Sequence, residues 1–214
     1  MLNYTSGPAN IASAVRTAKI RTIVSSRAFI EKAELGDLVT AIDGTGAKIL
    51  WLEEVRETIS TQEKLEAALL WSRPLHPVKP EDAAVILFTS GSEGTPKGVV
   101  LSHCNLHSNA AQADARVTIS VKDTLFNVLP VFHSFGLTGG TILPLLFGVR
   151  LFLYPSPLHF KQIPQIAAKV KPTIMFGTDT FLAGYSRAAK DSDFSSLRFV
   201  VAGAEAVRSD TRKT

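Results

Sequence analysis

The second half of the chain alternates short apolar runs with segments whose apolar residues recur at helical spacing. The apolar, β-rich runs predict strands at 85–89, 99–101, 124–129, 150–154, 173–176 and 198–202. The helical spacings predict helices at 102–116, 135–147, 163–170 and 180–190. Strands that alternate with helices are typical of βαβ units. We therefore predict an α/β fold with a mostly parallel sheet flanked by helices.

The first 75 residues show the same kinds of pattern less clearly. Helical spacing predicts helices that begin near Pro8, Ser26 and Ser60, the last with a capping box formed by Ser60 and Glu63. Strands are predicted at 21–25 and 48–55, and a turn at 43–46. Three prolines then interrupt the chain between residues 74 and 80. We predict an incomplete first α/β subdomain at 1–75 and a second, truncated one at 76–214.

Composition narrows the class of protein. The chain has 214 residues, of which 45% are hydrophobic and 20% charged, as is ordinary for a globular domain. The net charge of +4 is spread along the chain, which argues against a nucleic-acid surface. A single cysteine, Cys104, excludes an internal disulfide and fits a reducing compartment. No signal-peptide pattern is present at the start, and the apolar stretch 135–147 is shorter than the ~18–20 residues of a membrane span.

One polar stretch between two predicted strands has the composition of an anion-binding loop. It reads Thr89-Ser90-Gly91-Ser92-Glu93-Gly94-Thr95-Pro96-Lys97-Gly98. Glycines let the backbone approach an anion, and N–H groups, hydroxyls and an ammonium supply donors. It is not the common P-loop, because Pro96 precedes Lys97 where that pattern requires glycine. Taken alone, the stretch is also typical of an ordinary hairpin turn.

Two further loops follow predicted strands. The first contains His133 between Phe132 and Phe135, and the second contains Gly203-Ala204-Glu205. If the sheet is parallel, all three loops emerge at one edge and can line one cleft. The phenylalanines could then wall an apolar pocket with the imidazole facing a carboxylate, although a core histidine is the simpler alternative. The triplet alone is typical of a tight strand exit.

The ten-residue stretch resembles the phosphate loop of the adenylate-forming enzymes, a superfamily of acyl-CoA synthetases, luciferases and adenylation domains. The motif Pro130-x-x-His133-x-x-Gly136 is similar to one that lies beside the carboxylate substrate in this superfamily. The triplet at 203–205 is similar to the small residues that flank adenine. The resemblance implies catalytic roles for His133 and Lys97. It also implies a nucleotide site formed by Thr89, Ser90, Gly91, Ser92, Glu93, Gly94, Thr95, Lys97, Gly203, Ala204 and Glu205.

Longer strings narrow the resemblance to one branch. They are 87–94, 132–138, 153–159 and 200–205, and they look like the acyl-ACP synthetase part of the bifunctional 2-acylglycerophosphoethanolamine acyltransferase/acyl-ACP synthetases. This branch similarly carries Glu at position 93, where most of the superfamily has Thr. The resemblance implies ATP and Mg²⁺ as cofactors, a fatty acid as substrate, and acyl carrier protein or CoA as thiol partner. It also implies a place on the cytoplasmic side, with membrane association through a parent protein at the inner membrane.

Some features of the superfamily are missing from these 214 residues. No Tyr-Gly-x-Thr-Glu string is present, so we expect the chain not to form acyl-adenylate by itself. The His-x-x-x-x-Asp pair of phospholipid acyltransferases is also absent, which places that activity outside this stretch. A non-catalytic nucleotide- or acyl-binding module is the alternative. His103, Cys104 and His107 lack a third metal ligand with a fitting pattern, so no metal site is predicted among them.

Overall fold

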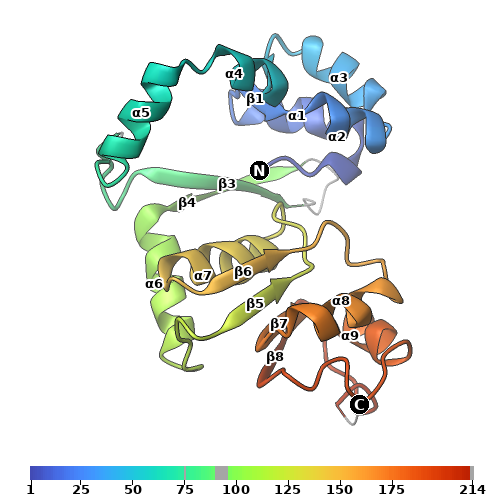
Figure 1. Cartoon of the computed structure of the whole chain (residues 1–214). Coiled ribbons are helices and arrows are strands. Elements are labelled where there is room, and N and C mark those ends of the chain that lie inside the picture. Colours follow the sequence, from blue (N-terminus) through green and yellow to red (C-terminus); the bar gives the residue numbers. More distant parts are fainter. Residues whose placement is uncertain (75, 90–95, 213–214) are drawn as a thin grey trace. The chain divides into compact units, whose positions relative to one another are not determined.

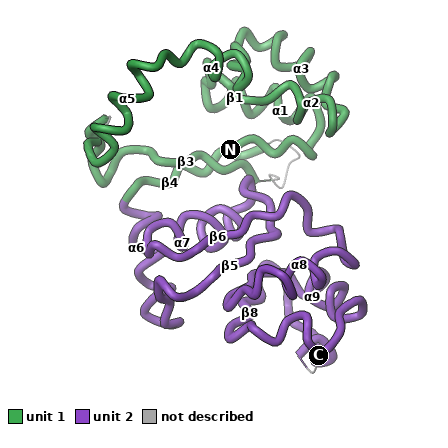
Figure 2. Tube along the Cα trace, in the orientation of Figure 1, with its two compact units in different colours: residues 1–103 green, residues 104–214 purple. Residues whose placement is uncertain are grey.

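The computed structural model describes residues 1–74, 76–89 and 96–212. The chain forms two compact units, residues 1–103 and residues 104–214 (Figure 2). The subdomain boundary that the prolines suggest near residue 75 stays a prediction about the complete protein.

Unit 1 contains all three helices expected from the first part of the chain, together with further helical segments that were not predicted (Figure 1). They are a 3₁₀ turn at Tyr4–Ser6 and helices α1 (Pro8–Thr17), α2 (Arg27–Lys32), α3 (Gly36–Asp43), α4 (Leu52–Thr58) and α5 (Thr61–Leu70). The capping box is confirmed, because Ser60 Oγ accepts from the backbone N–H of Glu63 while the Glu63 carboxylate accepts from that of Ser60. The small core of this unit is formed by Ile11, Val15, Leu38, Ile42 and Ala47.

Unit 1 also holds two separate strand pairs. Strands β1 (Thr22–Ser25) and β2 (Lys48–Trp51) are parallel, whereas β3 (Ala83–Thr89) and β4 (Lys97–Ser102) are antiparallel. The antiparallel pair corrects the assumption that every strand-end loop leaves a parallel sheet. The anion-binding stretch joins the two strands of a hairpin, so parallel topology gives no reason to place it with the other two loops.

The strand predicted at 48–55 is shorter than expected. It ends at Trp51, and α4 begins at the next residue. The helix is favoured because Glu53 Oε1 accepts from Ser26 Oγ at 2.8 Å and from the Arg27 N–H at 2.9 Å, which satisfies the start of α2. A hydrogen bond from its own backbone N–H, followed by those from Ser26 and Arg27, lowers the pKa of Glu53. An apolar run alone could not show this long-range cap.

Unit 2 is an α/β fold of the expected kind. Helix α6 (His103–Asp114) leads into a four-stranded parallel sheet of order β6-β5-β7-β8. The strands are β5 (Thr124–Asn127), β6 (Arg150–Leu153), β7 (Ile174–Gly177) and β8 (Phe199–Ala202). The connecting helices are η2 (Phe135–Ile142), α7 (Leu143–Leu146), α8 (Gln162–Val170) and α9 (Asp179–Ser186). The fold class is therefore confirmed.

The sheet of unit 2 has helices on both faces. Right-handed crossovers in this strand order place η2 and α7 on one face and α8 and α9 on the other. Strands β5 and β7 are buried throughout, as expected for central parallel strands. The core includes Leu125, Phe126, Ile163, Ala167, Ile174, Met175 and Tyr185.

The helix predicted at 135–147 divides into two segments. Phe135–Ile142 is a π-helix and Leu143–Leu146 is α-helical. Three glycines in the first segment give it low intrinsic helix propensity, so contacts outside the helix decide its winding. Its close contacts with β5 and β7 are described below.

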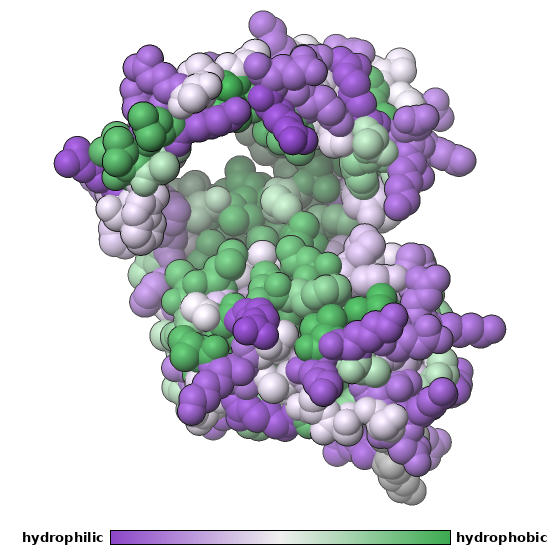
Figure 3. All heavy atoms as spheres, in the orientation of Figure 1, coloured by the Kyte–Doolittle hydropathy of each residue, from purple (hydrophilic) through white to green (hydrophobic). Residues whose placement is uncertain are grey.

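Large apolar side chains reach the surface in both units (Figure 3). They include Leu65, Leu69 and Trp71 in or beside α5, and Leu145 and Leu146 in α7. None of the helices formed by the described residues is long and apolar enough to cross a membrane.

Candidate functional site

The loops that leave the carboxyl ends of all four parallel strands contribute to one pocket of about 340 Å³ in unit 2. The chain runs from β5 to β6 in one direction and from β6 to β7 in the other, so the topology reverses between β5 and β7. Such a reversal is where open α/β sheets bind ligands. The lining residues are Leu129, Pro130, His133, Ser134, Phe135, Gly136, Pro157, Thr178, Phe181 and Ala204.

The loop after β5 presents His133 to this pocket. The His133 N–H donates to the Pro130 carbonyl at 3.1 Å, and the His133 carbonyl accepts from the Leu137 N–H at 2.9 Å. The imidazole is exposed, while its neighbour Phe132 is 7% exposed and packs with its ring 4.8 Å from the imidazole. The structure therefore does not favour the core-histidine alternative. Only one of the two flanking phenylalanines, Phe135, lines the pocket.

An aromatic stack supports the wall of the pocket. The ring of Phe135 lies 5.4 Å from that of Phe176 on β7, with an interplanar angle of 20°. Phe135 also lies close to Gly203, where a Cβ atom would be 3.1 Å from the ring. Two of the predicted loops, that of His133 and that of Gly203, are thus brought together.

Two residues of the triplet Gly203-Ala204-Glu205 have different places in the structure: Ala204 lines the pocket, and Glu205 caps a helix. Ala204 lines the pocket with a φ of 68°, in the left-handed region that few non-glycine residues occupy. Glu205 accepts from the Thr180 N–H at 2.9 Å and from its hydroxyl at 3.1 Å, which caps the start of α9. Hydrogen bonds from Thr178 and Thr180 lower the pKa of Glu205. A role of Glu205 in nucleotide binding stays a prediction, and its carboxylate already has these partners.

A second carboxylate orders the segment after the triplet. Asp179, in the first turn of α9, is 2% exposed and accepts from the Arg208 backbone N–H at 3.0 Å and from its Nε at 2.5 Å. Hydrogen bonds from Thr211 and Arg208 lower the pKa of Asp179. The anionic side chain also interacts favourably with the helix N-terminus.

In unit 1, the described ends of the anion-binding stretch face each other across the hairpin. Thr89 and Lys97 are paired in the register of β3 and β4, and both are exposed. Residues directly opposite in antiparallel strands project on the same side, so the hydroxyl and the ammonium are neighbours. Ser90, Gly91, Ser92, Glu93, Gly94 and Thr95 lie outside the described residues.

Sequence reasoning missed the pocket residues that the loops after β6 and β7 contribute. Thr178 and Phe181 come from the loop after β7 and the first turn of α9, and Pro157 from the loop after β6. A signal for Thr178 was present, since a hydroxyl residue just after a strand is a common helix cap, and its Oγ1 accepts from the Phe181 N–H at 3.4 Å. The Pro157 carbonyl accepts a hydrogen bond from the buried Tyr185 hydroxyl at 2.7 Å. The sequence gives no sign of this contact, because the two residues are far apart along the chain.

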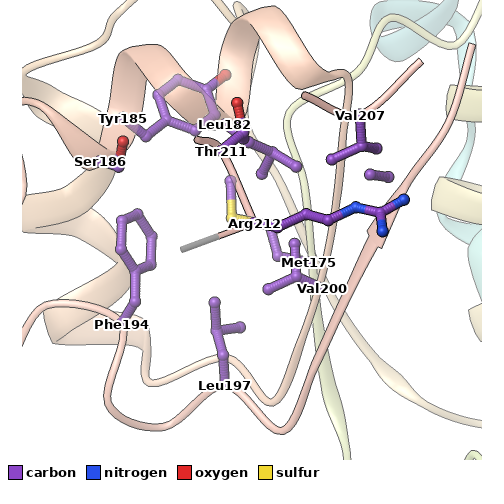
Figure 4. A pocket seen from close by; sticks show the side chains of 11 residues that line it. Met175, Leu182, Tyr185, Ser186, Phe194, Leu197, Val200, Val207, Thr211 and Arg212 are labelled. Atoms are coloured by element: carbon purple, nitrogen blue, oxygen red, sulfur yellow. The ribbon is translucent and has the colours of Figure 1, made fainter. Parts of the chain in front are cut away.

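A second pocket of about 400 Å³ lies on the face of the sheet covered by α9 (Figure 4). Met175, Leu182, Phe194, Leu197 and Val200 supply its apolar wall, and Thr211 and Arg212 lie at its border. It contains none of the residues predicted for the site. Within the described ranges, no cluster of three or more metal-ligating side chains is found.

Comparison with known proteins establishes the family. The family model of the AMP-binding enzymes matches residues 1–214, and the chain belongs to this family. The resemblance to adenylate-forming enzymes is thereby confirmed, while the finer assignment to the bifunctional branch stays a prediction.

Two curated relatives and one solved structure illustrate the range of similarity. The medium-chain-fatty-acid–[acyl-carrier-protein] ligase TtuA of Teredinibacter turnerae is 32% identical over 123 residues, 56% of this chain and 19% of that protein. The mitochondrial medium-chain acyl-CoA ligase ACSF2 of Macaca fascicularis is 31% identical over 173 residues, 78% of this chain and 27% of that protein. ATP-bound MatB from Rhodopseudomonas palustris superposes with a TM-score of 0.75 at 20% identity, over 99% of this chain and 41% of that one. This last likeness shows the fold.

Proposed function

We propose that the chain is part of an AMP-forming ligase that activates fatty acids. ATP and a fatty acid would form an acyl-adenylate and pyrophosphate, and the acyl group would then move to a thiol. One observation carries the proposal: in a member of the AMP-binding family, the predicted His133 lines a pocket at the topological switch point of the sheet.

The first step requires management of negative charge. A carboxylate oxygen attacks the α-phosphorus, and the bond from that phosphorus to the bridging oxygen of pyrophosphate breaks. The attacking oxygen approaches a group already surrounded by anionic oxygens. Lys97 and the hydroxyl of Thr89, side by side at the end of the hairpin, would offset this repulsion. Loss of one such donor typically raises a barrier by about 2.7–4 kcal/mol.

Magnesium would supply further charge neutralisation when bound with ATP. Its preferred ligands are oxygens, and Glu93 places a carboxylate in the middle of the stretch whose hydroxyls and N–H groups suit phosphate. This donor set fits the ion. We propose that Glu93 helps to hold Mg²⁺, because without a cation its charge would repel the triphosphate.

The second step is proposed to use the phosphopantetheine thiol of acyl carrier protein. The thiolate attacks the acyl carbonyl, and AMP leaves. The branch resemblance and the name of the relative TtuA support this choice, while the name of ACSF2 supports CoA as the alternative. The same branch resemblance is the basis for proposing a parent protein on the cytoplasmic side of the inner membrane.

The proposal is tested by calorimetric titration of the 214-residue chain with two acyl-adenylate analogues, decanoyl- and acetyl-sulfamoyl adenosine. We expect the decanoyl compound to bind at least about tenfold more tightly, because each buried CH₂ contributes about 0.8 kcal/mol. His133→Ala should weaken binding of both. Equal affinity for the two compounds would contradict the fatty-acid assignment.

A pyrophosphate-exchange assay tests whether these 214 residues alone support the first step. The chain spans a minority of the length of its relatives and contains no Tyr-Gly-x-Thr-Glu string, so we expect no exchange that depends on fatty acid. Fatty-acid-dependent exchange would show that these residues suffice for the first step.

The second pocket supports an alternative from another class, a non-catalytic acyl-binding module. Its apolar wall and volume of about 400 Å³ suit part of an acyl chain. Under this alternative, free decanoate would bind without adenosine, and Val200→Trp would abolish its binding while His133→Ala would not.

A further inference from the structure

The side chain of Asn127 is a buried polar group at the carboxyl end of β5. It is 1% exposed, and its amide is hydrogen-bonded on both sides. Oδ1 accepts from the Leu129 N–H at 3.0 Å, and Nδ2 donates to the Gly136 carbonyl at 3.2 Å. Thr141 Oγ1 donates to the same carbonyl at 3.0 Å. Asn127 therefore joins the start of the His133 loop to its end.

The π-helix is shaped to fit this amide. A Cβ atom at Gly140 would lie 2.4–2.5 Å from the three terminal atoms of Asn127, so only glycine allows the approach. Its neighbour Gly139 contacts Phe176 in the same way, with a Cβ position 2.8 Å from the ring. Asn127 and Phe176 are paired in the register of β5 and β7. The Gly139-Gly140 pair thus lies directly on two adjacent side chains of the sheet.

The contact at Gly136 closes the loop further. A Cβ atom there would be 2.3 Å from the Pro130 carbonyl oxygen. Since the segment Phe135–Ile142 has three glycines, its winding depends on such contacts. A buried amide with partners on both sides leaves little freedom for the backbone between residues 129 and 136.

We propose that Asn127 is a positioning residue for the activation of the carboxylic acid. By linking Leu129 to Gly136, it holds His133 and Phe135 at the pocket. The pocket role rests on the function proposed above. The link itself is a property of the fold and can be tested without any ligand.

The test is the substitution Asn127→Asp, followed by NMR of the Leu137 amide and the Phe135 ring at pH 5 and pH 8. The introduced carboxyl keeps an acceptor for Leu129 but, when ionised, opposes the Gly136 carbonyl. Burial raises the pKa of such a carboxyl, so its protonated form restores the donor at low pH. We expect both signals to match those of the unmodified chain at pH 5 and to differ at pH 8. Affinity for decanoyl-sulfamoyl adenosine should fall about tenfold, or about 1.4 kcal/mol, at pH 8 only, because His133 and Phe135 are then displaced from the pocket.

The matched control is Asp123→Asn, which alters a buried polar side chain at the opposite end of the same strand. It should leave both signals and the affinity unchanged even where it lowers stability. Thr141→Val, which removes only the hydroxyl on the Gly136 carbonyl, should shift the same signals less and serves if Asn127→Asp is unfolded at pH 8. The proposal would be overturned if the Leu137 and Phe135 signals were unchanged in both Asn127→Asp and Thr141→Val. It would also be overturned if Asp123→Asn changed these signals equally. If the unmodified chain does not bind the analogue, the proposed function fails while the signals still decide the role of Asn127.

Discussion

At the residue scale, the pocket depends on small residues beside large ones. Gly203 leaves room for the ring of Phe135, which stacks on Phe176. Close packing of this kind makes even one added methyl group felt.

Gly203→Ala is therefore expected to push Phe135 into the pocket. We predict at least about tenfold weaker binding of decanoyl-sulfamoyl adenosine, which corresponds to about 1.4 kcal/mol. Overpacking of this size typically destabilises by about 1–3 kcal/mol. The matched control is Gly36→Ala, whose Cβ position has no neighbour within 4 Å. Unchanged affinity in Gly203→Ala would show that the ring is not part of the binding surface.

The sequence predicted some of these residues and not others, for physical reasons. His133 could be predicted at a pocket because its loop follows a strand and its flanking residues are aromatic. Asn127 could not be predicted there, because a single polar residue in an apolar strand does not indicate which groups it bonds to. Its partners lie 2–14 positions further along the chain. Glu205 was grouped with nucleotide-binding residues, yet its capping of α9 depends on a tertiary contact that spacing does not encode.

At the element scale, most strands and helices could be predicted from periodicity, while the pairing of the strands needed a further argument. The error concerned β3 and β4 of unit 1, which were expected in a mostly parallel sheet and pair as an antiparallel hairpin. The connection at 90–96 is too short for a parallel crossover, which needs a dozen or more residues, so an antiparallel hairpin was the only suitable pairing. The length of the connection contained this information.

The hairpin makes a prediction about the roles of its two charged residues. Glu93→Thr should lower the dependence of ATP affinity on Mg²⁺, because it removes the proposed oxygen ligand. Lys97→Ala should weaken ATP binding about tenfold or more at every Mg²⁺ concentration, since a charge-assisted contact is lost. Calorimetric titrations with ATP over a series of Mg²⁺ concentrations separate the two effects, with Lys79→Ala as a lysine control outside the stretch. If Glu93→Thr leaves both the affinity and its Mg²⁺ dependence unchanged, the proposed role of Glu93 is wrong.

At the scale of the whole molecule, each unit has a core of its own, and unit 2 carries an additional polar clamp at the edge of the sheet opposite the pocket. Asp123 is 3% exposed, just before β5. It accepts from Arg198 Nε at 2.9 Å and from Thr173 Oγ1 at 2.7 Å, beside the starts of β8 and β7. The clamp therefore joins three of the four strands at their amino ends, and hydrogen bonds from Arg198 and Thr173 lower the pKa of Asp123.

This clamp should make the stability of unit 2 depend on pH. Because the pKa of Asp123 is lower in the folded chain than the ~3.9 of an unfolded aspartate, its contribution is complete above about pH 4 and is lost as pH falls further. Asp123→Asn should lower the free energy of unfolding by about 1–3 kcal/mol at pH 7, at the lower end because Arg198 is 41% exposed and screened by solvent. The difference between the two proteins should shrink as pH falls below about 4, because Asp123 then binds a proton in the unfolded chain while the carboxylate in the folded chain is still ionised. Hydrogen exchange of β5 and β7 amides measures it, and the exposed Asp191→Asn controls for the change in net charge. An equal effect of both substitutions would mean that net charge, and not the clamp, sets the acid stability of this unit.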